Sequence, residues 1–120
     1  MVFRAFIVAA ILLSGAALAG EADVVAARAM QEPGGTWRFE VTVRHADDGW
    51  KHFSDRWEVL APDGKVLATR VLMHPHETEQ PFTRSMAGIV IPPGVEEVIV
   101  RARDRLHGYG GAEVIVTLGD

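Results

Sequence analysis

The sequence predicts an all-β domain, a single seven-stranded antiparallel β-sandwich of the immunoglobulin or fibronectin-III kind. Two observations predict it. Apolar and polar residues alternate with period two after Asp23, as they do in strands with one face toward a core. Turn-forming Pro, Gly and Asp residues recur about every 8–12 residues, the spacing typical of sandwiches. Cysteine is missing from the 120 residues, so disulfides cannot hold the core.

The first part of the chain has the pattern of an export signal. Arg4 precedes an apolar run over residues 5–13, and Ala17-Leu18-Ala19 offers the small-x-small motif at which signal peptidases cut. We expect residues 1–19 to be removed and residues 20–120 to form one domain in the periplasm or outside the cell. The run is too short for a membrane span, and without cysteine no lipid can be attached at the cut.

The charge balance argues against a nucleic-acid partner. The chain has 12 basic and 16 acidic residues, and loss of Arg4 with the leader leaves 11 against 16, a net charge of −5. A nucleic-acid binder would present a basic face.

The strands follow from the alternation, which is clearest where Trp37, Phe39, Val41 and Val43 are separated by charged or polar residues. The predicted strands cover residues 23–31, 37–45, 55–60, 65–72, 82–90, 95–103 and 112–118. The expected core comprises Trp37, Phe39, Val41, Val43, Trp57, Val59, Val98, Val100, Val114 and Val116. A helix is expected nowhere, apart from a single turn within residues 49–55.

The connections between these strands are of two alternating kinds. Residues 32–35, 62–64 and 91–94 form compact Pro/Gly turns without histidine. Residues 46–54, 73–81 and 104–111 form longer loops that carry or border all five histidines. Successive connections of an antiparallel sandwich fall at opposite ends of the domain. We therefore expect one rim to gather His45, His52, His74, His76 and His107.

A histidine rim in an exported chain without thiols indicates a metal site, with Cu(II) ahead of Zn(II). His74 and His76, spaced by an extending proline, are the expected first ligand pair. His107 and either His45 or His52 would complete the set. Glu79 or Asp104 would add an oxygen ligand or orient an imidazole. Because imidazole binds metal only when neutral, acid should release the ion.

Two alternatives stand beside the metal site. Trp50, Phe53 and Tyr109 lie in the same group of loops and would suit a module that binds an exported protein partner without metal. Alternatively, Trp50 and Phe53 would plug the end of the core. The histidines could also be unrelated polar loop residues. The sequence contains no HExxH, P-loop or GxGxxG motif, so an enzyme is the weaker interpretation and no catalytic residue is assigned.

Three stretches carry a resemblance to known proteins. They are HADDGW at residues 45–50, HPHETEQPFTRS at 74–85 and HGYGG at 107–111. The chain resembles a group of small exported bacterial proteins of unassigned function. The resemblance implies export and brings no activity or ligand with it.

Overall fold

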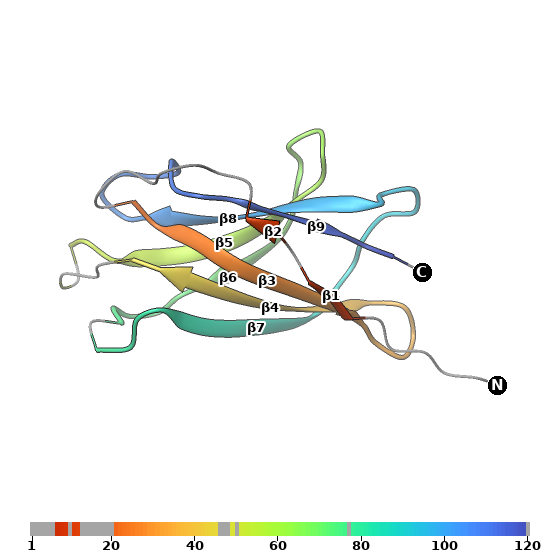
Figure 1. Ribbon diagram of the computed structural model, residues 1–120, viewed down its shortest axis with the longest axis horizontal. Helices are drawn as coiled ribbons and strands as arrows, with labels where there is room; N and C mark the ends of the chain where they lie inside the picture. The colour runs from red at the N-terminus through yellow and green to blue at the C-terminus, as the bar shows by residue number, and fades with distance from the viewer. Residues whose placement is uncertain are drawn as a thin grey trace.

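The computed structural model describes residues 7–9, 11–12, 21–45, 49, 51–76 and 78–119, and its regular secondary structure in those residues is all β. Two antiparallel sheets face each other (Figure 1). One sheet has the order β1 (Ile7–Ala9), β3 (Asp23–Gln31), β4 (Trp37–Arg44), β7 (Phe82–Ile89). The other has the order β2 (Ile11–Leu12), β9 (Val114–Thr117), β8 (Glu97–Asp104), β5 (Ser54–Leu60), β6 (Val66–Val71).

The seven strands predicted from the sequence correspond to β3 through β9, and their ends agree to within two residues. The prediction of an all-β fold with two antiparallel sheets is therefore confirmed. Two further short strands, β1 and β2, lie inside the stretch predicted to be a signal peptide, and they pair with β3 and β9. Removal of that stretch stays a prediction.

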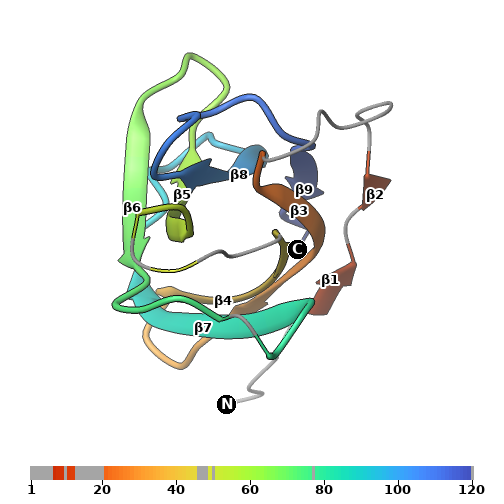
Figure 2. The same cartoon turned by 90° about the vertical axis from the view of Figure 1, so that its left-hand side faces the viewer.

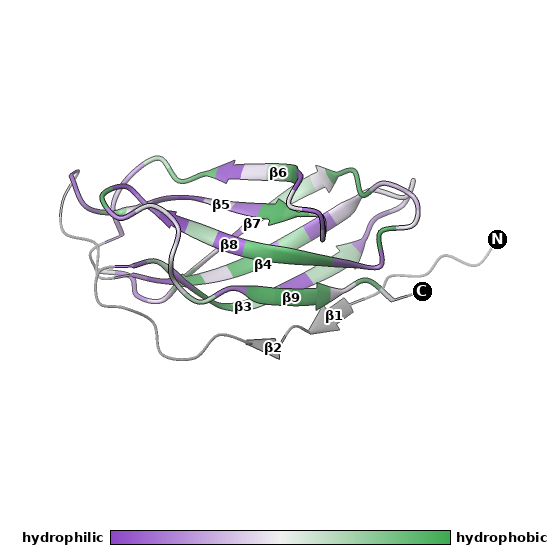
Figure 3. Ribbon diagram, turned by 90° about the horizontal axis from the view of Figure 1, so that it is seen from above, coloured by the Kyte–Doolittle hydropathy of each residue, from purple (hydrophilic) through white to green (hydrophobic). Residues whose placement is uncertain are grey.

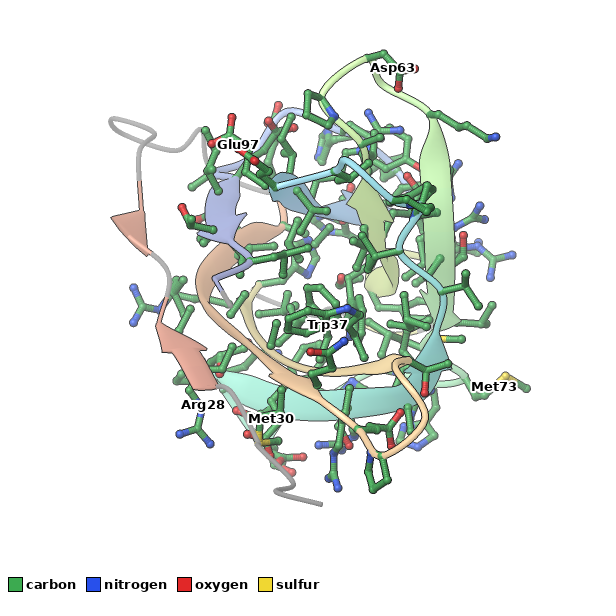
Figure 4. The ribbon with its side chains drawn as sticks, turned by 90° about the vertical axis from the view of Figure 1, so that its right-hand side faces the viewer. Arg28, Met30, Trp37, Asp63, Met73 and Glu97 are labelled. Atoms are coloured by element: carbon green, nitrogen blue, oxygen red, sulfur yellow. The ribbon has the colours of Figure 1, made fainter. Side chains whose placement is uncertain are left out.

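The core lies between the two sheets, where the alternation placed it. All ten expected core residues are buried, with Trp37 the most exposed at 7%. Trp37 lies in the interior between the layers (Figure 4), and apolar residues follow β9 and one part of β8 (Figure 3). Each fully buried large apolar side chain contributes about 1.5–3 kcal/mol of transfer free energy, so the burial of these ten core residues dominates the stability of the domain.

The two ends of the sandwich differ as the loop pattern predicts. The β3–β4, β5–β6 and β7–β8 turns lie at one end, and the β4–β5, β6–β7 and β8–β9 loops lie at the other (Figure 1). The first two turns close through Gly35 N–H to Glu32 O at 3.0 Å and Gly64 N–H to Ala61 O at 2.9 Å. Figure 2 looks onto the end with the long loops.

No helix among the described residues is both long and apolar enough to cross a membrane. Near the expected helical turn, the His52 N–H reaches Gly49 O at 3.3 Å, a single turn that goes no further.

Candidate metal centre

Asp104, the last residue of β8, is fully buried at the end with the long loops. Its backbone N–H donates to Gly108 O, and the Gly108 N–H donates to Asp104 O, both at 2.8 Å, so residues 104–108 form a tight turn. The carboxylate oxygen Oδ2 accepts the N–H groups of Leu106 at 3.0 Å and His107 at 2.5 Å. These bonds fix the orientation of the carboxylate and leave its other oxygen, Oδ1, pointing elsewhere.

Oδ1 of Asp104 meets two imidazoles. It lies 2.5 Å from His45 Nε2 and 3.1 Å from His52 Nε2. Neither contact has the geometry of a hydrogen bond, and Oδ1 accepts none from the part of the chain that the structure describes. A buried carboxylate oxygen without a hydrogen bond is costly, because its lost hydration is not replaced. The donor atoms of three residues therefore converge, at spacings that an ion would have to widen.

Two different elements supply the imidazoles. His45 directly follows β4 and continues the inward-facing series of Val41 and Val43, so its ring enters the interior and only 2% of the residue is exposed. Its backbone N–H donates to Gln80 Oε1 at 2.9 Å. His52 comes from the β4–β5 loop, beyond Gly49, whose φ of +75° is a conformation that favours glycine.

The three residues fit a small divalent ion. One donor atom from each of His45, His52 and Asp104 lies within 4.8 Å of the others, and no other group of three such residues occurs in the described ranges. Ligands about 2.0–2.2 Å from a tetrahedral ion stand roughly 3.3 Å apart. The contact between His45 Nε2 and Asp104 Oδ1 would therefore widen by about 0.8 Å to admit an ion, and the one to His52 by less.

His107 lies beside this group. Its ring centroid is 5.1 Å from that of His52, and the His52 centroid is 4.9 Å from that of His45. His107 is exposed to solvent.

The other two histidines form a pair of their own. The ring centroids of His74 and His76 are 4.8 Å apart, and the His76 ring stacks on Phe82 at 4.0 Å with an interplanar angle of 14°. His74 is exposed, whereas His76 is only 6% exposed. His74 and His76, the pair expected to lead the site, are not part of the three-donor group of His45, His52 and Asp104.

Gln80 links the two histidine groups, which the sequence did not indicate. Its side-chain amide donates to His76 O at 2.8 Å while its oxygen accepts the His45 N–H at 2.9 Å. The β6–β7 loop therefore supports the histidine at the end of β4.

Of the expected oxygen ligands, only Asp104 is in the centre. Glu79 accepts hydrogen bonds from the Arg84 guanidinium at 3.0 and 3.4 Å. That guanidinium holds the pKa of the Glu79 carboxyl below its usual range.

Two of the three loop aromatics, Phe53 and Tyr109, lie among the described residues. Phe53 is only 3% exposed, and its carbonyl accepts the Arg105 N–H at 2.9 Å. The Tyr109 ring lies 3.8 Å from the Arg101 guanidinium and is 37% exposed; its burial raises the pKa of the phenol. Trp50 falls outside the described residues.

Comparison with known proteins gives one match. The chain is 42% identical over 96 residues to a protein of Halomicrobium mukohataei named "Putative lipoprotein". The match covers 80% of this chain and 47% of that protein, so the chain spans about half the length of its relative. No family model and no solved structure matches the chain.

Proposed function

We propose that this protein is an exported metal-binding β-sandwich that holds Cu(II) or Zn(II) with His45, His52 and Asp104. The observation that carries the proposal is the Oδ1 atom of Asp104. It is buried, it accepts no hydrogen bond from the described chain, and two imidazole nitrogens lie 2.5 and 3.1 Å from it.

The donor set determines the class of ion. Two imidazole nitrogens and one carboxylate oxygen suit Cu(II) and Zn(II), whereas Cu(I) prefers the thiolate and thioether donors that this centre lacks. Because the imidazoles must be neutral to bind, acid should release the ion.

Burial favours holding an ion over catalysis. The side chains of His45 and Asp104 are both 0% exposed. A catalytic metal keeps a position open to its substrate, and two ligands sealed from solvent restrict that access. A carrier, buffer or sensor of metal ions is therefore the better match.

Export and the finer fold type belong to the same proposal. The N-terminal pattern and the name of the relative both support export. Counted from β3, the sheets hold the first, second and fifth strands and the seventh, sixth, third and fourth strands. That order supports an immunoglobulin/fibronectin-III-like sandwich in which the fourth strand joins the sheet of the third.

The test is a competition titration of the exported, purified protein with Cu(II) and Zn(II) against a chromophoric chelator. We expect a Kd of about 1 μM or tighter for at least one of the two ions. His45→Gln and Asp104→Asn should each weaken binding by roughly 100-fold or more, the scale of about 2.7 kcal/mol. The matched control is the double variant His74→Ala with His76→Ala, which should bind like the wild type.

Two results would contradict the proposal. One is the absence of binding near micromolar concentration for both ions. The other is a loss of binding in the double variant while Asp104→Asn, verified as folded by circular dichroism, binds normally. The second result would move the site to the His74–His76 pair.

A further inference from the structure

We propose that His107 is a fourth ligand, and that the metal ion enters and leaves the centre through it. The loaded site would then consist of three imidazoles and one carboxylate. This inference rests on the proposed metal-binding function and identifies the path of exchange at the same centre.

The imidazole rings of His45, His52 and His107 lie in a row, each in contact with the next. The ring centroids of His45 and His52 are 4.9 Å apart with an interplanar angle of 89°, and those of His52 and His107 are 5.1 Å apart at 78°. Two imidazoles on one tetrahedral ion have centroids roughly 5.2 Å apart, because each ligating nitrogen lies about 2.0–2.1 Å from the ion. Both observed spacings agree with that value to within about 0.3 Å. The His107 nitrogens are not yet in the group of donor atoms that lie within 4.8 Å of one another, so the His107 ring must turn to bind.

The solvent exposure of the side chain increases from His45 through His52 to His107. The His45 side chain is 0% exposed, that of His52 is 22% exposed, and His107 is in solvent. An ion arriving from water therefore meets His107 first and the buried pair of His45 and Asp104 last. Release runs through the same residues in the opposite order.

The backbone of His107 is held by the ligand that it would join. Its N–H donates to Asp104 Oδ2 at 2.5 Å, within the turn that the paired backbone bonds of Asp104 and Gly108 close. The exposed ring can still change rotamer about its own side-chain bonds, a motion of picoseconds to nanoseconds that needs no opening of the loop. Capture of an ion by His107 is thus a side-chain movement on a fixed turn.

Four protein ligands would fill a tetrahedral Zn(II) site or the square plane of a Cu(II) site. Closed four-coordinate sites hold their ion, whereas catalytic ones leave a position for water or substrate. The inference therefore places the protein among those that store or transfer an ion.

The experiment loads the exported protein with one equivalent of Cu(II) and records electron paramagnetic resonance, affinity and binding rate. The wild type should show coupling to three nitrogens. His107→Ala should show two, bind at least about tenfold more weakly (about 1.4 kcal/mol) and load more slowly. His107→Glu should also show two nitrogens but retain tighter binding than His107→Ala, because it replaces one donor with another. His74→Ala, which removes an exposed histidine of the other group, is the matched control and should behave like the wild type.

The outcomes separate this inference from the proposed function. A wild-type protein that binds no Cu(II) refutes the metal centre itself. A wild type that binds Cu(II) with two nitrogens, or a His107→Ala variant with unchanged spectrum and affinity, overturns only the role of His107. Because His107 is exposed, the variants should fold, and circular dichroism checks this; should His107→Ala fail to fold, the nitrogen count of His107→Glu decides.

Discussion

The substitution Gly111→Ala should reveal how closely the β8–β9 loop packs against the start of β3, through its effect on the stability of the domain. A Cβ atom added at this position would lie 1.9 Å from Ala22 O and 2.7 Å from Asp23 Oδ1. Ordinary carbon–oxygen contacts are roughly 3.3 Å or longer, so Gly111→Ala must push the two backbones about 1.4 Å apart. The atom nearest to the added Cβ is the backbone carbonyl oxygen of Ala22, which cannot move out of the way by a change of side-chain rotamer.

The separation would break two neighbouring bonds, Val24 N–H to Ala112 O and Ala112 N–H to Asp23 Oδ1, both 2.8 Å long. Two hydrogen bonds at about 1 kcal/mol each, with about 1–3 kcal/mol for overpacking, give a loss of roughly 3–5 kcal/mol in the free energy of unfolding. For a domain of this size that lowers Tm by roughly 12 °C or more.

The assay is thermal and urea denaturation followed by circular dichroism, with two comparison variants. Gly119 has no atom within 4 Å of an added Cβ, so Gly119→Ala should change stability by at most about 0.5 kcal/mol. Gly110→Ala should fall between the two, because its Cβ meets the Glu21 carboxylate, the end of a flexible side chain. If Gly111→Ala unfolds at the same midpoint as Gly119→Ala, the close approach of these segments is refuted.

Two predictions concern pH. Tyr109 is the single tyrosine of the chain, so an ultraviolet titration of tyrosinate reports it alone. Burial and the nearby Glu58 carboxylate raise its pKa, so the midpoint should lie above 10.0 and fall in Glu58→Gln; a wild-type midpoint at or below 10.0 would contradict this. The lowered pKa of Glu79, caused first by its hydrogen bond to Arg84, means that this pair stabilises the fold above pH 4.5 and stops doing so as pH falls through the folded pKa. The difference in unfolding free energy between wild type and Glu79→Gln should therefore shrink in acid, and Arg84→Gln should lose the same dependence; a difference that stays constant with pH would argue against the pair.

The sequence predicted the strands and the two unlike ends well, because both depend on local patterns. The alternation of apolar and polar residues determines which side chains face the core, and the Pro/Gly turns mark where each strand ends. Because successive strands are antiparallel, the connections between them fall alternately at the two ends of the sandwich. The same alternation also indicates that residues 45 and 104 face inward, since they continue the series of Val41 and Val43 and of Val100 and Ala102. A histidine and an aspartate on the inner face at the same end were the available signal for the three-donor group.

The three-donor group could not be predicted, because it depends on how separate loops fold against one another. Adjacency in sequence favoured His74 and His76 as the first ligand pair, which stays a prediction; the ring of His76 stacks on Phe82. The turn that aims the Asp104 carboxylate depends on backbone bonds to Gly108, Leu106 and His107, which no periodicity encodes. The short strands β1 and β2 were also missed, since a continuous apolar run has no period that identifies a strand.

Strands β1 and β2 each cover one edge of the sandwich. β1 pairs with residues 28–30 of β3, and β2 pairs with residues 114–115 of β9. A cut after Ala19 would strip both edges of their partners, and unpaired strand edges recruit other strands. The edges of β3 and β9 would then become able to pair with another chain only after a protease has made this cut. Amide hydrogen exchange at residues 28–30 would report it, because exchange there should be faster in the cut protein than in the uncut one.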